Sequence, residues 1–305
     1  MSTARLTILG AGSALPTRYN FPSSQLLELR EKQYLIDCGE GTQISMRQMG
    51  LKTKRLNRIF ISHLHGDHCF GLVGLISSFA LLNRTADLYI HGPKGITELY
   101  ASQMEFFCNQ IPYTVHFVEH DTTQFQKIHE DRSIEIYTIP LKHRVPACGF
   151  LFKEKAKDRH IKREMIDYHK VPFSQINLIK QGADFINEEG KLIENKLLTT
   201  EPAKTISYAY CSDTIYTETI IPWITGVDLL YHEATFADSE AARAKTTMHS
   251  TAKQAASIAQ QANVKQLVIG HLSSRYSSNQ NIVLQEAKSV FENTILAEDK
   301  MVIEF

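Results

Sequence analysis

The sequence lacks several features that would place it in a specialised class of protein. Lys plus Arg and Asp plus Glu are balanced at 33 each, so the bulk charge does not indicate a nucleic-acid-binding protein, and any such affinity must be local. The five cysteines include no C-x-x-C pair, and their odd number indicates a reducing compartment, the cytoplasm, rather than a disulfide framework. The most apolar window, residues 71–82, falls well short of the roughly 20 residues that cross a bilayer. We therefore expect a cytoplasmic protein without a membrane-spanning segment.

No targeting signal is recognisable at the start of the chain. The apolar stretch Leu6-Thr7-Ile8-Leu9 is too short for the core of a signal peptide, so we expect the mature protein to begin near Met1. A chain of 305 residues, 43% of them hydrophobic, is long enough for one large domain. We expect a single α/β domain over residues 1–305.

Short strand-forming runs alternate with helical patterns along most of the chain. We expect strands at residues 5–9, 25–29, 34–37, 58–62, 87–91, 114–119, 134–139, 149–153, 205–211, 228–232, 266–271 and 301–305. We expect helices at residues 42–49, 71–82, 95–106, 251–262 and 281–292. Paired strands followed by helices predict two mixed sheets packed face to face, with helices on both outer faces, which is a four-layer αββα sandwich.

One segment, residues 154–200, breaks this pattern because it has many charges and no strand period. We interpret it as an inserted arm. Between Lys142 and Lys170 there are nine Lys and Arg against four Asp and Glu. Such a surplus can grip a phosphate backbone, although a solvated charged face is the alternative interpretation. The candidate substrate-binding residues here are Lys153, Lys155, Lys157, Arg159, Lys162 and Arg163.

The segment His63-Leu64-His65-Gly66-Asp67-His68 has the composition of a metal site. In an extended loop His63 and His65 point the same way, while Asp67 and His68 reach a neighbouring point, so one loop can serve two metal ions. Imidazole and carboxylate without thiolate suit Zn²⁺ or Mn²⁺ in a catalytic site. Exposed loop histidines are the alternative, but four ligand-type residues within six positions argue against it. Further ligands must come from other strand ends, where His143, Asp213 and His271 stand.

Motifs along nearly the whole chain resemble those of the metallo-β-lactamase superfamily and, within it, the short form of the ribonuclease Z family, which processes the 3′ ends of tRNA. The matching segments are residues 9–14, 36–43, 60–68, 92–95, 143–146, 231–236, 249–251 and 271–276. The pattern His-x-His-x-Asp-His is typical of the superfamily, whereas His232-Glu233-Ala234-Thr235, His249-Ser250-Thr251 and the inserted arm are typical of ribonuclease Z. The resemblance implies the metallo-β-lactamase αββα fold with a tRNA-binding arm. Many bacterial arms end in a Gly- and Pro-rich tip, which this arm lacks.

The resemblance also implies roles for individual residues. It implies two Zn²⁺ ions per subunit, with Mn²⁺ or another divalent ion as a substitute. One ion would be held by His63, His65 and His143, the other by Asp67, His68 and His271, with Asp213 bridging both. It further implies His249 as general acid, Glu233 as the residue that orients it, and Asp67 as acceptor of the proton of the attacking water.

Some of these residues have other interpretations. His249 precedes Ser250 and Thr251, where it would instead cap a helix, and His232 is the alternative to Glu233 as a supporting residue. Arg275 and Tyr276 would anchor a phosphate or a base, or belong to an ordinary loop.

The implied function is a zinc-dependent endoribonuclease that removes the 3′ trailer from precursor tRNA and works as a homodimer. Attack by hydroxide shared between two metals would leave a 3′-hydroxyl on the tRNA and a 5′-phosphate on the trailer. A small-molecule metallohydrolase, arylsulfatase-like or a cyclic phosphodiesterase, is the alternative. A non-catalytic RNA-binding scaffold is a further one, against which the complete ligand set argues. We expect neither a membrane nor DNA as a partner.

Overall fold

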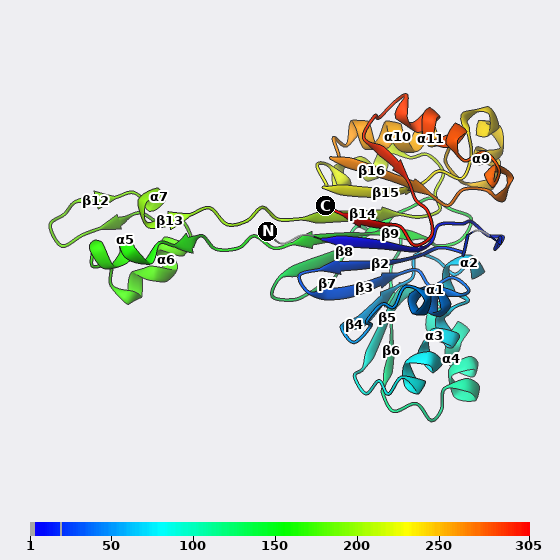
Figure 1. Cartoon of the computed structure of the whole chain (residues 1–305), viewed down its shortest axis with the longest axis horizontal. Coiled ribbons are helices and arrows are strands. Elements are labelled where there is room, and N and C mark those ends of the chain that lie inside the picture. Colours follow the sequence, from blue (N-terminus) through cyan, green and yellow to red (C-terminus); the bar gives the residue numbers. More distant parts are fainter. Residues whose placement is uncertain (1–3, 19) are drawn as a thin grey trace. The chain divides into compact units, whose positions relative to one another are not determined.

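The computed structural model describes residues 4–18 and 20–305, which divide into two compact units (Figure 1). The core unit contains the described residues up to Lys153 together with Ile206–Phe305, and the arm unit is Glu154–Thr205. Residues 1–3, where we expect the mature protein to begin, lie outside the described residues. Among the described residues, no helix has the length and apolar character needed to cross a membrane.

Two seven-stranded sheets form the core unit. The first has the order β18 (Val302–Glu304), β1 (Arg5–Gly10), β2 (Ser24–Leu29), β3 (Lys32–Ile36), β4 (Leu56–Phe60), β5 (Leu88–Pro93), β6 (Val115–His120). The second has the order β17 (Thr294–Leu296), β16 (Gln266–Gly270), β15 (Leu229–Glu233), β14 (Ser207–Cys211), β9 (Cys148–Glu154), β8 (Ile134–Pro140), β7 (Lys127–Glu130). Strands β3 to β6 pair in parallel, and so do β14 to β17. The carboxyl ends of each parallel set therefore meet at one edge of its sheet.

Three buried clusters fill the spaces between four layers. The inner faces of the sheets meet through Phe60 and Tyr34 on one side and Phe150, Phe152 and Tyr208 on the other. The outer face of the first sheet packs on helices α1 (Thr42–Gln48), α3 (Leu72–Leu81) and α4 (Ile96–Phe107). The outer face of the second packs on α8 (Ile221–Ile224), α10 (Ala252–Gln261) and α11 (Asn281–Lys288). This arrangement confirms the predicted αββα sandwich.

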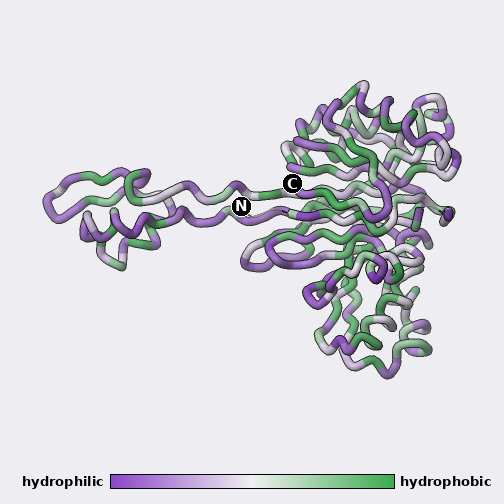
Figure 2. Tube along the Cα trace, in the orientation of Figure 1, coloured by the Kyte–Doolittle hydropathy of each residue, from purple (hydrophilic) through white to green (hydrophobic). Residues whose placement is uncertain are grey.

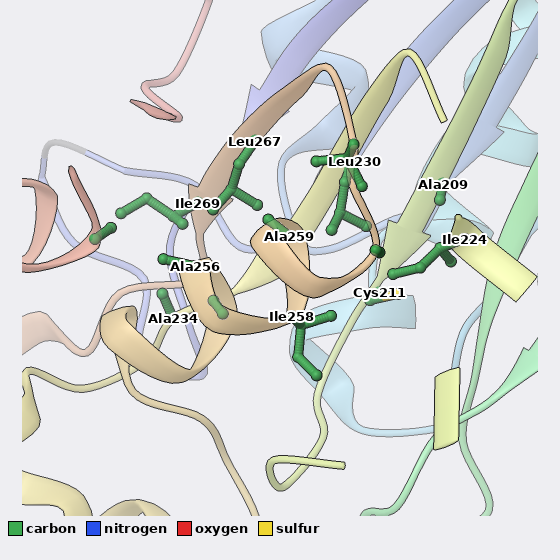
Figure 3. Packing of buried hydrophobic residues seen from close by; sticks show 14 of the residues in the cluster. Ala209, Cys211, Ile224, Leu230, Ala234, Ala256, Ile258, Ala259, Leu267 and Ile269 are labelled. Atoms are coloured by element: carbon green, nitrogen blue, oxygen red, sulfur yellow. The ribbon is translucent and has the colours of Figure 1, made fainter. Parts of the chain in front are cut away.

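Helix α10 shows how the sequence produces the outer layer. Thr251 caps its start, because its hydroxyl accepts the N–H of Gln254 while the Gln254 side chain accepts the N–H of Thr251. The helix then turns its small face, with Ala256 and Ala259, toward strands β15 and β16 (Figure 3). Small side chains there let the helix lie close to the sheet.

Strand β14 is buried on both faces. Tyr208 and Tyr210 belong to the cluster between the sheets, while Ala209 and Cys211 face the helices, which is the alternation of a strand. Figure 2 shows the central strands as mostly hydrophobic and many outer turns as hydrophilic. All five cysteines are buried and free.

The expected elements agree with the structure, but several short elements of the core unit and all those of the arm unit were not predicted. All twelve expected strands and all five expected helices form, with ends that differ by a few residues. The prediction missed β7, a polar edge strand of sequence KIHE, and the three-residue β17. It also missed the short helices α2 (Gly66–Cys69), α8 and α9 (Ala241–Thr247). Elements this short complete too little of a period to be recognised.

The arm unit has a hydrophobic core of its own. Its elements are β10 (His160–Ile161), α5 (Arg163–Tyr168), α6 (Ile176–Lys180), β11 (Phe185–Ile186), β12 (Leu192–Ile193), α7 (Asn195–Leu198) and β13 (Thr199–Thr200). Ile166, Ile179, Phe185 and Leu198 pack together inside it. The buried amide of Asn195 donates to the carbonyls of Ile179 and Ala183, both at 2.7 Å. These hydrogen bonds join the start of α7 to α6 and to the turn that follows it.

Candidate metal centre

The metal-ligand candidates lie on loops and a short helix that follow strands of both sheets. The segment after β4 carries four of them in a loop and on α2, and the other three follow β8, β14 and β16. The structure brings all seven together: His63, His65, Asp67, His68, His143, Asp213 and His271.

Four of these residues form a first cluster. Nδ1 of His65 lies 3.1 Å from Nε2 of His63 and 3.3 Å from Nε2 of His143. Oδ2 of Asp213 lies 3.5 Å from Nε2 of His63 and 3.7 Å from Nε2 of His143. Three nitrogens and one carboxylate oxygen thus surround one point, which is a suitable ligand set for Zn²⁺.

The remaining three form a second cluster around the other oxygen of Asp213. Oδ2 of Asp67 lies 3.3 Å from Nε2 of His68 and 3.3 Å from Nε2 of His271. Oδ1 of Asp213 lies 3.4 Å and 3.3 Å from the same two nitrogens. Asp213 therefore offers one oxygen to each cluster, as a bridging ligand would.

Asp37 supports the second cluster, and the sequence analysis did not single it out. Its Oδ1 accepts the N–H of Ser62 at 2.7 Å, and its Oδ2 accepts the hydroxyl of Tyr210 at 2.6 Å. Nδ1 of His68 lies 2.7 Å from Oδ2 and donates to it, which leaves the lone pair of Nε2 toward the cluster. The signal in the sequence was a lone acidic residue directly after the apolar strand 34–36, inside one of the family motifs.

Other histidines are oriented in the same way. Nδ1 of His143 donates to the carbonyl of Met248 at 2.9 Å, and Nδ1 of His271 lies 3.0 Å from Oγ1 of Thr235. Met248 holds its carbonyl there with a left-handed backbone, φ 59°, in a residue other than glycine. These contacts turn the opposite ring nitrogens toward the clusters.

The protonation states of the histidines and carboxylates in the two clusters favour the binding of cations. Burial lowers the pKa of His143 to about 4, and burial also lowers the pKa of His63, so both rings are neutral at neutral pH, the form in which imidazole can bind a metal. Burial opposes charge on His68 too, but Asp67 and Asp213 outweigh it and raise its pKa. The carboxylates therefore stabilise positive charge at this point, whether a proton or a metal carries it.

His249 and Glu233 form a pair beside the clusters. Oε1 of Glu233 lies 3.0 Å from Nδ1 of His249 and accepts the N–H groups of Ser250 and Thr214 at 3.0 and 3.2 Å. Burial opposes charge on His249, but Glu233 outweighs it and raises the pKa of His249 to about 9. The imidazole is therefore oriented and protonated.

The alternative interpretations of this pair do not fit the geometry. Thr251, not His249, caps helix α10. His232 is buried on β15 and its Nδ1 donates to the carbonyl of Glu233 at 2.7 Å, while the Glu233 carboxylate carries the contact to His249.

Arg275 and Tyr276 follow β16, and their side chains contact the loop that follows β15. Nη1 of Arg275 lies 2.9 Å from Oε2 of Glu240, and its guanidinium lies over the ring of Phe236 at 5.4 Å. The hydroxyl of Tyr276 accepts the N–H of Ala237 at 2.9 Å. Both side chains therefore stabilise this loop. Fewer of their polar atoms remain for hydrogen bonds to an RNA ligand.

The candidate substrate-binding Lys and Arg residues between 153 and 163 differ in exposure. Arg159 donates to Oγ1 of Thr199 at 2.7 Å and pairs with Glu201, and Lys162 donates to the carbonyl of Lys196 at 3.0 Å, so both stabilise the arm unit. Three others are exposed: Lys153, Lys157 and Arg163. Lys155 is half-buried.

Comparisons with known proteins agree with this architecture. The model of the family described as Anti-Pycsar protein Apyc1 matches residues 4–179. Ribonuclease Z of Bacteroides fragilis is 55% identical over 303 residues, which cover 99% of each chain. The crystal structure of human tRNase Z, short form, superposes with a TM-score of 0.70 at 25% identity and covers 98% of both chains. The metallo-β-lactamase fold protein YhfI of Bacillus subtilis has a TM-score of 0.70 at 17% identity over the full length of both chains.

These matches confirm the fold and the family that the motifs predicted. The match to the Apyc1 model ends inside the arm unit, whereas the match to the B. fragilis enzyme extends over nearly the whole chain. The chain therefore belongs, through residues 4–179, to the family that the Apyc1 model describes and, over nearly its whole length, to the ribonuclease Z family of endoribonucleases.

Proposed function

We propose that this enzyme removes the 3′ trailer from precursor tRNA with the help of two Zn²⁺ ions. The observation that carries the proposal is the pair of ligand clusters that share Asp213, one oxygen to each. A single structural zinc site would not need a second cluster of Asp67, His68 and His271. Attack on the phosphodiester from water would leave a 3′-hydroxyl on the tRNA and a 5′-phosphate on the trailer.

The residues present fit two divalent cations. All seven ligand side chains offer nitrogen or carboxylate oxygen, and none offers sulfur, which suits Zn²⁺ and also permits Mn²⁺. His63, His65 and His143 would hold one ion, Asp67, His68 and His271 the other, and Asp213 both. Such ions, when bound, would supply a water that is acidic enough to attack near neutral pH and would stabilise negative charge on the phosphate.

The protein's own groups would handle the protons. Asp67 directs Oδ2 toward His68 and His271, and its second carboxylate oxygen can accept the proton of the attacking water. His249, held through Nδ1 by Glu233, has Nε2–H to donate to the departing 3′ oxygen. Glu233 keeps the donor charged until transfer, because its carboxylate stabilises the imidazolium.

The arm unit would bind the body of the tRNA. Its exposed Lys157 and Arg163 offer charge to phosphates, and its Tyr168 and Phe173, 77% and 92% exposed, offer rings on which bases can stack. With Lys153 at the adjoining strand, they form the basis of our proposal that the arm is the tRNA-binding site.

We also propose that two copies of the chain associate through the helices over the first sheet. Leu81 at the end of α3 is 84% exposed, and Phe106 and Phe107 at the end of α4 are 78% and 62% exposed. A second copy covering these side chains would remove a large apolar surface from water. Light scattering should give the mass of a dimer, and Phe106→Ser with Leu81→Ser should give that of a monomer.

The five free cysteines support a reducing compartment, the cytoplasm, as the place of action.

One assay tests the proposed reaction. The protein is incubated with an end-labelled precursor tRNA, with and without a chelator, and the cut ends are mapped. We expect a single chelator-sensitive cut at the trailer that leaves a 3′-hydroxyl. Asp213→Ala should abolish it, whereas His160→Ala, an exposed histidine of the arm unit, should cut at the same position. Turnover of bis(p-nitrophenyl) phosphate or an aryl sulfate without tRNA cleavage would instead identify a small-molecule hydrolase.

A further inference from the structure

A turn between the two sheets lies beside the metal centre. Residues 297–301 connect β17, at one edge of the second sheet, to β18, at one edge of the first. Ala297 donates its N–H to the carbonyl of Ile269 on β16, and Lys300 donates to the carbonyl of Ile8 on β1, both at 2.8 Å. The turn is therefore held by both sheets, and Ile269 is only two residues before the candidate ligand His271. The proposed reaction assigns no role to this turn.

Asp299, in the middle of the turn, is half-buried and uses both of its carboxylate oxygens. Oδ1 accepts the N–H of Ala11 at 2.9 Å, and Oδ2 accepts the N–H of Phe21 at 2.7 Å. Ala11 and Phe21 lie near opposite ends of the loop between β1 and β2, and the carbonyl of Phe21 accepts the N–H of Gly12 at 2.9 Å. Among side chains only a carboxylate offers two equivalent acceptor oxygens to two such donors. Asp299 therefore holds both ends of the loop.

Ala11 extends this contact to the metal centre. Its carbonyl accepts the N–H of His271 at 2.9 Å, and its neighbour Gly12 forms a parallel bridge with Leu272. Ala11 is 2% exposed, so water has little access to replace its hydrogen bonds. Two hydrogen bonds thus link the carboxylate of Asp299, through Ala11, to the backbone of His271.

The backbone of His271 needs such support. It is left-handed, φ 59°, which a residue other than glycine keeps only where its surroundings hold it. The direction of Cβ follows from this conformation, and it places Nε2 at 3.3 Å from both Oδ2 of Asp67 and Oδ1 of Asp213. Thr235 contacts Nδ1 and so fixes the rotation of the ring, whereas Ala11 fixes the backbone from which the ring extends. Both contacts are required to keep Nε2 in place.

We propose that Asp299 is a positioning residue for the second metal ion, because it holds Ala11 and thereby the backbone of His271. This inference rests on the proposed function, since it takes His271 as a ligand of that ion. In the described part of the chain, neither Asp299 nor Ala11 forms a hydrogen bond with His63, His65 or His143. Loss of the Asp299 carboxylate should therefore weaken the binding of one ion and spare the other.

Removal of zinc from the loaded protein tests the proposal. Wild type and Asp299→Asn are treated with increasing concentrations of a chelator, and the zinc released is counted with a dye. The amide keeps one acceptor oxygen and turns an NH₂ group toward the other N–H, so one of the two contacts is lost. We expect two zinc ions per chain in both proteins. In Asp299→Asn one ion should bind about tenfold more weakly, at the lower end of the range for residues that support a ligand indirectly.

Two control variants separate positioning from a general loss of stability. Glu298→Gln changes the exposed acidic neighbour in the same turn and should keep both affinities. Tyr113→Phe removes a hydroxyl that donates to the carbonyl of Ile76 at 2.7 Å, remote from the turn, and should lower the unfolding temperature without weakening either ion. Equal weakening of both ions in Asp299→Asn, or no weakening of either, would overturn the proposal. A wild type that holds fewer than two ions would overturn the ligand set itself, and this inference with it.

A second measurement needs no variant. Coupling between two sites is reciprocal, so if Asp299 and Ala11 support the ion, the ion supports their hydrogen bonds. Removal of zinc from the wild type should speed the exchange of the amide hydrogens of Ala11, Phe21 and His271 by about tenfold, the same factor as in the affinity. Unchanged exchange at Ala11 and Phe21 would show that the loop is independent of the metal centre, contrary to the proposal.

Discussion

Oδ2 of Asp37 lies 2.7 Å from Nδ1 of His68, on the side of the imidazole that faces away from the metal centre. The ring donates its Nδ1 proton to this carboxylate and so keeps Nε2 as a ligand. Asp37 adopts a left-handed backbone, φ 56°, at the end of β3, and Ser62 and Tyr210 hold its carboxylate in place. A residue outside the ligand set thus determines the tautomer of a ligand.

We predict that Asp37→Asn weakens zinc binding roughly tenfold to a hundredfold, because a neutral amide can either accept from or donate to Nδ1 of His68 and does not raise the basicity of the ring. Competition with a chelating dye measures the affinity. Asp131→Asn, which removes a carboxylate remote from the centre, serves as the control and should keep the wild-type affinity. If Asp37→Asn also keeps it while remaining folded, Asp37 has no part in orienting the ligand.

We predict that Glu233→Gln lowers kcat on precursor tRNA by roughly a hundredfold while KM and zinc content change little. The amide still accepts a hydrogen bond from His249 but no longer stabilises the imidazolium, so proton donation becomes weaker. Single-turnover cleavage and metal analysis measure the two effects. The double variant with His249→Ala should be no slower than His249→Ala alone, since both changes remove the same function. Additive losses would show that Glu233 acts elsewhere.

We predict that deletion of residues 156–195 raises KM for precursor tRNA at least about tenfold and leaves the hydrolysis of bis(p-nitrophenyl) phosphate unchanged. The arm unit has its own core, so its removal exposes little of the hydrophobic interior of the core unit. Steady-state assays on both substrates give the comparison. A smaller salt dependence of tRNA binding should accompany the loss, because fewer phosphates are neutralised. Equal loss on both substrates would contradict this separation of roles.

We predict that acid destabilises the core unit through a histidine pair remote from the metal centre. Nδ1 of His91 donates to Nε2 of His120 at 2.9 Å, and burial lowers the pKa of His120 to about 4. The unfolded chain, with a histidine pKa near about 6.5, binds more protons. The stabilisation is therefore complete above about pH 6.5 and is lost as the pH falls toward 4, by up to about 3 kcal/mol.

Urea unfolding at pH 7 and pH 5 measures this effect. Because the metal ligands also gain protons in acid, the test is the comparison with His120→Gln, which should show a smaller loss of unfolding free energy over the same interval. The exposed His160→Gln is the control and should lose as much as the wild type. An equal loss in all three proteins would remove His120 from the explanation.

Local sequence was sufficient for the longer elements of the core unit and for one half of the metal centre. The apolar run within residues 205–211 predicts a strand, and the short spacing of His63, His65, Asp67 and His68 predicts a loop that serves two metals. Periodicity and close spacing are properties of neighbouring residues, so they can be read without the fold. The family motifs extended this to His143, Asp213 and His271.

Tertiary structure alone decided which distant residues meet. Nε2 of His68 lies 3.3 Å from Nε2 of His271, 203 residues away in the chain, because the packing of the two sheets brings together the loops after β4 and β16, which belong to different sheets. The same packing places Asp37 behind His68 and Arg275 beside Glu240. No local pattern encodes these contacts, since they depend on how two sheets pack. The sequence thus indicated a metal site, and the fold decided which side chains orient its candidate ligands.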